Sequence, residues 1–305
     1  MQTRHIYYKD VPAIELITKT VRAVVVPMQG GKVASFRSLA SGKEYLLQNP
    51  SPSFLKMGMQ DAFVDCEAAG FDDMFPTIDP VSVSCADGTT LFYPDHGELC
   101  RLPFEVQESA SALTLRTSSD ALGYAYEKTF TEDADGGLHI RFRIENTAPR
   151  DLDALWAAHF LLNVEKGGAL LLPFDKGEPT DIVDAPTGNF QAGTRVPLCD
   201  ELLLGRWPQS APDCRKLYFP RKLPAGFVGY RGPTGDVLML EFDKQQLPYL
   251  GLWINLGYLH GDYCVGLEPA SVGYDTVKNA EAHDQKDVLR KGASKEFFIK
   301  LSIQA

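Results

Sequence analysis

Short runs of alternating apolar and polar residues dominate the sequence and restrict the folds that it can adopt. Clear examples cover residues 112–118, 124–132 and 137–146, and the turn-like segments 120–123 and 133–137 separate them. Because side chains of a β-strand alternate between the two faces of a sheet, this period of two predicts half-buried strands. The short connections predict that neighbouring strands pair in an antiparallel way.

Helical patterns are rare in this chain. Only residues 276–289 have a helix-like composition, and residues 49–70 indicate a long irregular loop with one helical turn. We expect the Pro-, Gly- and Asp-rich residues 174–212 to run irregularly over the surface. No repeat of about 20 to 50 residues points to a propeller or solenoid. The sequence therefore predicts an all-β fold, a large antiparallel β-sandwich with few short helices, which residues 1–305 form as a single domain.

Charge and composition argue against several classes of partner. The formal net charge is −10, which disfavours broad electrostatic binding of nucleic acid or of anionic membranes. No apolar run reaches the length of a membrane span, and the first ten residues lack the apolar core of a secretory signal. The six cysteines show no CxxC spacing, so we expect free thiols and a cytoplasmic protein.

Residues 154–163 form the most distinctive strand pattern, because a histidine lies within an apolar run that has no Gly, Pro or charge. On one face of such a strand, His159 lies in line with Ala157, Leu161 and Asn163. Two interpretations stay open at this point. His159 is either a buried structural residue with a local hydrogen bond or part of a functional site.

Three other stretches carry polar residues that strands and turns alone do not require. Asp72 and Asp73 lie between aromatic residues, His96 precedes a glycine in a loop, and Glu268 ends an apolar strand. Burying an unpaired carboxylate is costly, and desolvation would raise the pKa of Glu268 toward that of a useful base. The simpler roles are a turn cap for the aspartates, an exposed loop position for His96 and a structural ion pair for Glu268.

Four short motifs resemble those of the galactose mutarotase-like superfamily, which includes the aldose 1-epimerases, and they follow the order in that superfamily. The motifs are residues 70–77 (GFDDMFPT), 95–98 (DHGE), 156–160 (WAAHF) and 266–269 (GLEP). The resemblance covers most of the chain and implies a large antiparallel supersandwich that binds a hexose in an open cleft on one sheet. It also implies that His159 acts as general acid on the ring oxygen, Glu268 as general base on the anomeric hydroxyl, and His96 as an assisting residue.

The chemistry of mutarotation explains why such residues are needed. Removing the O1 proton while protonating the ring oxygen opens the cyclic hemiacetal, and the ring closes on its other face with the two roles reversed. This takes a carboxylate and an imidazolium on opposite sides of one sugar ring, and no metal or cofactor. Further candidates for contacts with the sugar are Asp72, Asp73, Arg37, Arg101, Trp156, Trp253 and His260. The two tryptophans would offer an apolar platform.

Substrate and reaction stay open on the sequence alone. Arg101 lies one residue beyond the position that carries arginine in hexose-6-phosphate relatives, where this chain has Cys100. A second interpretation is a non-catalytic carbohydrate-binding or sugar-sensing protein on the same fold. A third is a metal-dependent sugar isomerase or lyase that uses His96, Glu98 and His159 or His260. We expect a small-molecule sugar as the partner, and either a monomer or a homodimer.

Overall fold

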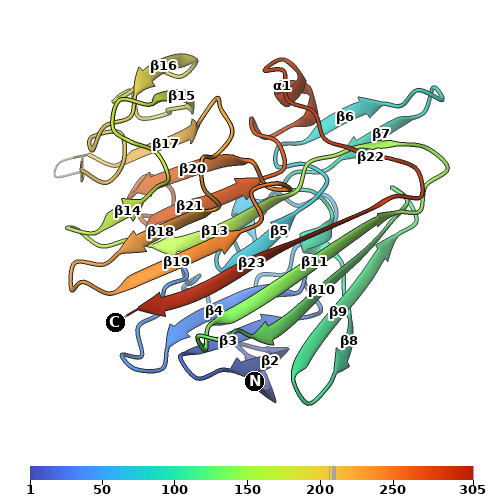
Figure 1. Ribbon diagram of the computed structural model, residues 1–305, viewed down its shortest axis with the longest axis horizontal. Coiled ribbons are helices and arrows are strands. Elements are labelled where there is room, and N and C mark those ends of the chain that lie inside the picture. Colours follow the sequence, from blue (N-terminus) through green and yellow to red (C-terminus); the bar gives the residue numbers. More distant parts are fainter. Residues whose placement is uncertain (206, 208–210, 305) are drawn as a thin grey trace.

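The computed structural model describes residues 1–205, 207 and 211–304. The larger of its two main β-sheets runs from β16 (Thr194–Pro197) at the upper left of Figure 1 to β2 (Val11–Ile17) near the bottom. Within the described residues this sheet has eleven strands, and every pair of neighbours is antiparallel. In sheet order the strands are β1 (Gln2–Tyr8), β2 (Val11–Ile17), β3 (Val21–Val26), β4 (Lys32–Ser38), β5 (Phe71–Met74), β13 (Ala157–Asn163), β21 (Tyr263–Ala270), β20 (Tyr249–Leu256), β17 (Asp213–Tyr218), β15 (Pro179–Asp184) and β16 (Thr194–Pro197).

The smaller sheet has eight strands among the same described residues. Their order is β14 (Ala169–Leu171), β18 (Phe227–Arg231), β19 (Val237–Phe242), β23 (Ser294–Gln304), β11 (Leu138–Asn146), β10 (Tyr124–Glu132), β9 (Ala112–Ser119) and β8 (Glu105–Glu108). Two further strand pairs are β6 (Val81–Ser84) with β7 (Thr90–Tyr93), and β12 (Leu152–Asp153) with β22 (Val288–Leu289).

Helical structure in the described part of the chain is limited to α1 (Val277–Glu281) and to 3₁₀ turns at Phe63–Asp65 and Leu99–Arg101. None of these helices is long and apolar enough to cross a membrane. The prediction of an all-β antiparallel sandwich with few short helices is therefore confirmed.

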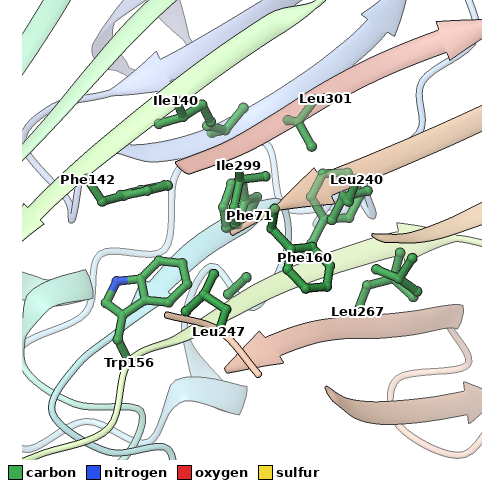
Figure 2. Close-up of a cluster of buried hydrophobic side chains, with 14 of the residues drawn as sticks. Phe71, Ile140, Phe142, Trp156, Phe160, Leu240, Leu247, Leu267, Ile299 and Leu301 are labelled. Atoms are coloured by element: carbon green, nitrogen blue, oxygen red, sulfur yellow. The ribbon is translucent and has the colours of Figure 1, made fainter. Parts of the chain in front are cut away.

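Alternation along the strands decides which side chains fill the space between the sheets. On β13, Ala158, Phe160 and Leu162 belong to the main hydrophobic core, whereas Ala157 and Leu161 belong to smaller clusters on the opposite face. Figure 2 shows the core, where side chains of both sheets meet. Those labelled are Phe71, Ile140, Phe142, Trp156, Phe160, Leu240, Leu247, Leu267, Ile299 and Leu301.

Two expected segments differ from the structure. Residues 179–184 and 194–197 form β15 and β16, which extend one edge of the larger sheet, so the prediction of an irregular section is wrong for these residues. Pro179 is the first residue of β15 and Pro197 is the last residue of the edge strand β16. The start of a strand and an edge strand are the positions where a sheet accepts proline, which has no N–H to donate. Residues 206 and 208–210 of that section lie outside the described residues. Only residues 277–281 of the helix-like segment 276–289 form an α-helix.

A buried ion pair links the two sheets inside the core. Asp73 on β5 accepts hydrogen bonds from Lys128 Nζ at 2.8 Å and from the Tyr126 hydroxyl at 3.1 Å, both on β10. The Trp156 indole donates to the Tyr126 hydroxyl at 3.0 Å. Lys128 and Asp73 are each only 1% exposed, so the two charges depend on each other for compensation.

We predict that Lys128→Met lowers the free energy of unfolding by about 3–5 kcal/mol, because it leaves the Asp73 carboxylate buried without its partner charge. Arg116→Met is the matched control, since Arg116 pairs with Glu127 at 2.7 Å on the surface and should cost less than about 1 kcal/mol. Unfolding in guanidinium chloride measures both. Equal losses in the two variants would contradict a structural role for the buried pair.

Candidate active site

Neighbouring strands at the centre of the larger sheet present polar side chains on the face that points away from the smaller sheet. His159 of β13, Glu268 of β21, Trp253 of β20 and Lys216 of β17 line a cavity of about 430 Å³ that opens to solvent. Lys216 is paired directly opposite Trp253 in the register of β17 and β20. The alternation that sends every second residue into the core thus brings these polar residues together.

Glu268 belongs to the wall of the cavity, and its side chain is fully buried there. Its Oε2 pairs with the Lys216 ammonium group, which also lies 3.1 Å from Asp275 Oδ1. Its Oε1 has no hydrogen-bond partner among the described residues and lies 3.9 Å from His159 Nε2. Burial raises the pKa of Glu268 against the opposing effect of Lys216, and Asp275 adds to the rise. A carboxylate with one free oxygen and a raised pKa suits the role of a general base.

The charge of Lys216 is retained in this setting. Burial by itself would lower the pKa of Lys216, but the carboxylates of Asp275 and Glu268 outweigh burial and raise that pKa. Lys216 therefore holds one oxygen of Glu268 in place as a permanent cation and leaves the other oxygen free.

Two glycines leave room for the Glu268 carboxylate. Gly266 lies two residues earlier on the same face of β21, and Gly251 of β20 is paired with Glu268 across the strands. A Cβ atom at position 266 would lie 2.8 Å from Oε1, and one at position 251 would lie 3.0 Å from Oε2. The Cβ atom at position 251 would also lie 2.9 Å from the Tyr218 ring. Glycine at these positions therefore leaves the space that the carboxylate and the Tyr218 ring occupy.

His159 lies on the strand next to Glu268 and is 5% exposed. Burial lowers the pKa of His159 well below its ordinary value, and the charges of His96, Lys216 and Lys32 lower it further. His159 therefore carries a positive charge only at acidic pH. The Asn163 side chain donates to the Leu46 carbonyl oxygen at 2.8 Å. His159 Nδ1 has no hydrogen-bond partner among the described residues, so the local hydrogen bond of the structural interpretation is not formed.

His96 reaches the cavity from the loop that follows β7. Its Nδ1 lies 2.8 Å from Asp95 Oδ1, and its ring stacks on Phe63 with centroids 4.2 Å apart. The rings of His96 and His159 meet edge to face at 5.1 Å. The structure thus brings the three predicted catalytic residues, His96, His159 and Glu268, to one cavity.

Two of the predicted sugar-contact residues also line this cavity. Trp253 is half-buried on β20, and its ring offers an apolar surface. His260 is exposed, in the turn that follows β20, and its Nε2 lies 3.3 Å from the carbonyl oxygen of Val64.

The two aspartates and Trp156 lie outside the cavity lining. Neighbouring residues of a strand point to opposite faces of the sheet, so the side chains of Asp72 and Asp73 lie on different faces. Asp72, opposite His159 in the strand register, is buried and pairs with the Lys32 ammonium group. Asp73 and Trp156 belong to the buried network between the sheets. The expectation that these three residues contact the sugar is therefore wrong, and their contacts are structural.

The two arginine candidates have other partners. Arg37 lies on the surface of β4 and donates from Nε to Glu44 at 2.9 Å. Arg101 is buried and donates to the backbone carbonyl oxygens of Gly97 at 2.6 Å and Gly58 at 3.0 Å. Neither lines the cavity, so the expectation that they contact the sugar is corrected as well.

Lys216 and Asp275 are site residues that our sequence reasoning missed. The available signal was the alternation in residues 213–218, where Lys216 shares a face with Cys214 and Tyr218 within a buried strand. A lysine in such a strand requires a carboxylate partner. No local pattern identifies that partner, because Glu268 lies 52 residues further along the chain.

The third interpretation requires three metal ligands in one place. No group of three or more His, Cys, Asp or Glu side chains in the described part of the chain is arranged to hold a metal ion. Glu98 is buried, and its charge acts on the core residue Tyr124 rather than on the cavity. The residues His96, Glu98 and His159 therefore do not form the expected ligand set.

Comparisons with known proteins give matches at the level of structure alone. No protein-family model matches the chain, and no curated protein is significantly similar in sequence. A galactose mutarotase-like protein from Lactobacillus casei superposes with a TM-score of 0.67 at 18% identity, over 96% of this chain and 100% of that protein.

Two other solved structures are similar over nearly their whole length. A galactose mutarotase-like protein from Clostridium acetobutylicum has a TM-score of 0.71 at 12% identity and covers 100% of this chain and 98% of its own. An aldose epimerase homologue from C. elegans has a TM-score of 0.65 at 14% identity, with 99% of both chains covered. These comparisons show that the chain has the galactose mutarotase-like β-sandwich fold.

Proposed function

We propose that this protein is an aldose 1-epimerase-like isomerase, a mutarotase that interconverts the α and β anomers of a hexose or a related sugar. The observation that carries the proposal is the geometry of Glu268. Its Oε1 is free of hydrogen-bond partners among the described residues, belongs to a fully buried carboxylate, and lies 3.9 Å from His159 Nε2 in an accessible cavity.

The reaction follows from these two groups. Glu268 Oε1 takes the proton from O1 of the sugar while His159 Nε2 gives a proton to the ring oxygen, so that the C1–O5 bond breaks and a C1 carbonyl forms. Rotation about C1–C2 turns the other face of the carbonyl to the O5 hydroxyl. Ring closure returns both protons, so each group ends in its starting state.

The relative position of the acid and the base differs from the expectation. Glu268 and His159 lie side by side on neighbouring strands rather than on opposite sides of a ring. This arrangement serves the same reaction, because O1 and O5 of a pyranose are bonded to the same carbon. A sugar that presents its anomeric edge to the strand pair places both oxygens near both groups.

Other cavity residues would orient the sugar. The half-buried ring of Trp253 faces the cavity and suits the C–H surface of a pyranose, with polar groups on the remaining sides. His96 approaches from the loop side, where Asp95 and Phe63 fix its ring. All six cysteines lie in the described residues as free thiols, which supports a reducing, cytoplasmic location.

We predict that Glu268→Gln reduces the acceleration of mutarotation by about 100-fold or more, because the amide cannot accept the O1 proton. His159→Ala should have an effect of the same order. Relaxation of freshly dissolved α-D-glucose and α-D-galactose, followed by polarimetry, measures both against a buffer blank. Glu165→Gln, on a half-exposed carboxylate outside the cavity lining, is the control.

A loss of less than tenfold in Glu268→Gln would remove Glu268 from the role of base. Calorimetric binding of a sugar without any acceleration would instead favour a carbohydrate-binding protein.

The pH dependence of kcat/KM should be bell-shaped, because the reaction needs an ionised base and a protonated acid. The base must be ionised, so activity falls as pH drops through the pKa of Glu268, which lies above the ordinary value of 4.5. The acid must be protonated, so activity falls as pH rises through the pKa of His159, which lies well below the ordinary value of 6.5. Initial rates across this range test the expectation, and a flat profile up to alkaline pH contradicts it.

Lys216→Met should move the acidic limb of that profile to higher pH. Without the ammonium group, Glu268 and Asp275 face each other as like charges in a buried site, and the pKa of Glu268 rises. Lys216→Arg keeps the charge and should leave the limb near its original position. If Lys216→Met lowers kcat/KM equally at every pH, Lys216 has only a structural role.

A further inference from the structure

The charges around the cavity are strongly unequal. Among the described residues, the carboxylates of Asp79, Asp184, Asp262, Glu268 and Asp275 line it, together with one lysine and no arginine. The three lining histidines add positive charge only where they are protonated.

The single lysine is not available to an anionic ligand. Lys216 lies between Glu268 and Asp275, and it contacts both carboxylates. The two carboxylates together outweigh the one positive charge of Lys216, so this group of three side chains has an excess of negative charge.

The other three carboxylates lie nearer the solvent and have no ion-pair partner within the described residues. Asp79 and Asp184 are exposed and Asp262 is half-buried. These three carboxylates therefore add negative charge at the entrance that no ion pair within the described residues neutralises.

The arginines that would serve a phosphate group are engaged elsewhere. Arg101 donates to backbone carbonyl oxygens, and Arg37 pairs with Glu44 on the surface. Phosphate recognition in proteins uses clustered, bidentate arginines or free lysines, which the described lining does not offer. The unpartnered and fully buried Glu268 Oε1 adds a further acceptor for a hydrogen-bond donor of the ligand.

We propose that the cavity selects sugars without phosphate or carboxylate groups and favours those that carry a basic amino group. This inference rests on the proposed function for the site and specifies its substrate class. A protonated amine gains from the carboxylates at the entrance, a neutral sugar is tolerated, and a sugar phosphate is repelled by like charge.

Three sugars with one shared pyranose ring test the inference: 6-amino-6-deoxyglucose, glucose and glucose 6-phosphate, together with the same series in galactose. We expect kcat/KM for mutarotation at neutral pH and low salt to be highest for the amino sugar. It should be at least about tenfold lower for the phosphate than for the neutral sugar, and salt should reduce the difference. Calorimetric affinities for the same sugars should follow the same order.

The double variant Asp184→Asn, Asp262→Asn removes entrance charge with little change in shape. It should reduce the ratio of kcat/KM for the amino sugar to kcat/KM for the phosphate by about tenfold. An unchanged ratio would show that these carboxylates do not discriminate and would overturn the inference.

The outcomes separate this inference from the proposed function. A phosphate that reacts or binds as well as the neutral sugar overturns the inference and leaves the mutarotase proposal standing. The expected order of affinities without any acceleration overturns the mutarotase proposal and supports the ligand class. Equal or absent binding of all three sugars overturns the inference.

Discussion

The separation of the two faces of the larger sheet is the constraint on which the rest of the structure depends. Strands β13, β20 and β21 each send one set of side chains between the sheets and the other set toward the cavity. The inner set is apolar and closely packed, which fixes the backbone of these strands. The positions of His159 and Glu268 are therefore set by the sandwich itself, and a rigid sheet positions catalytic groups more precisely than loops do.

Buried lysine–carboxylate pairs occur on both faces of the sheet, and two of them, Asp73–Lys128 and Glu268–Lys216, differ in their surroundings. Asp73 and Lys128 are enclosed between the sheets, with Tyr126 as a further partner, so no ligand reaches them. Glu268 and Lys216 line an open cavity, and one oxygen of the Glu268 carboxylate has no hydrogen-bond partner among the described residues. The same kind of ion pair thus lies enclosed in the core on one face and beside an open cavity on the other.

The sequence allowed the fold class and the central residues of the site to be predicted, because both depend on local patterns. Alternation predicted the strands, and polar residues in apolar or glycine-bounded settings indicated His159, Glu268 and His96. Asp72 and Asp73 were wrongly treated as equivalent, although the same alternation rule separates them once residues 71–74 are known to be a strand. Lys216 was missed for a different reason. Its role depends on which strands become neighbours in the sheet, and that order is not encoded locally.

The two glycines beside Glu268 have a consequence for how this protein changes over evolutionary time. Positions 251 and 266 lie in well-formed strands, where alanine is acceptable to the backbone, yet a methyl group at either would press on the carboxylate. A single codon change at these positions would therefore displace the Glu268 carboxylate while the sandwich still assembles. Descendants of this chain have a short route to a folded protein with an altered cavity, and the identity of these two residues distinguishes the two kinds of descendant.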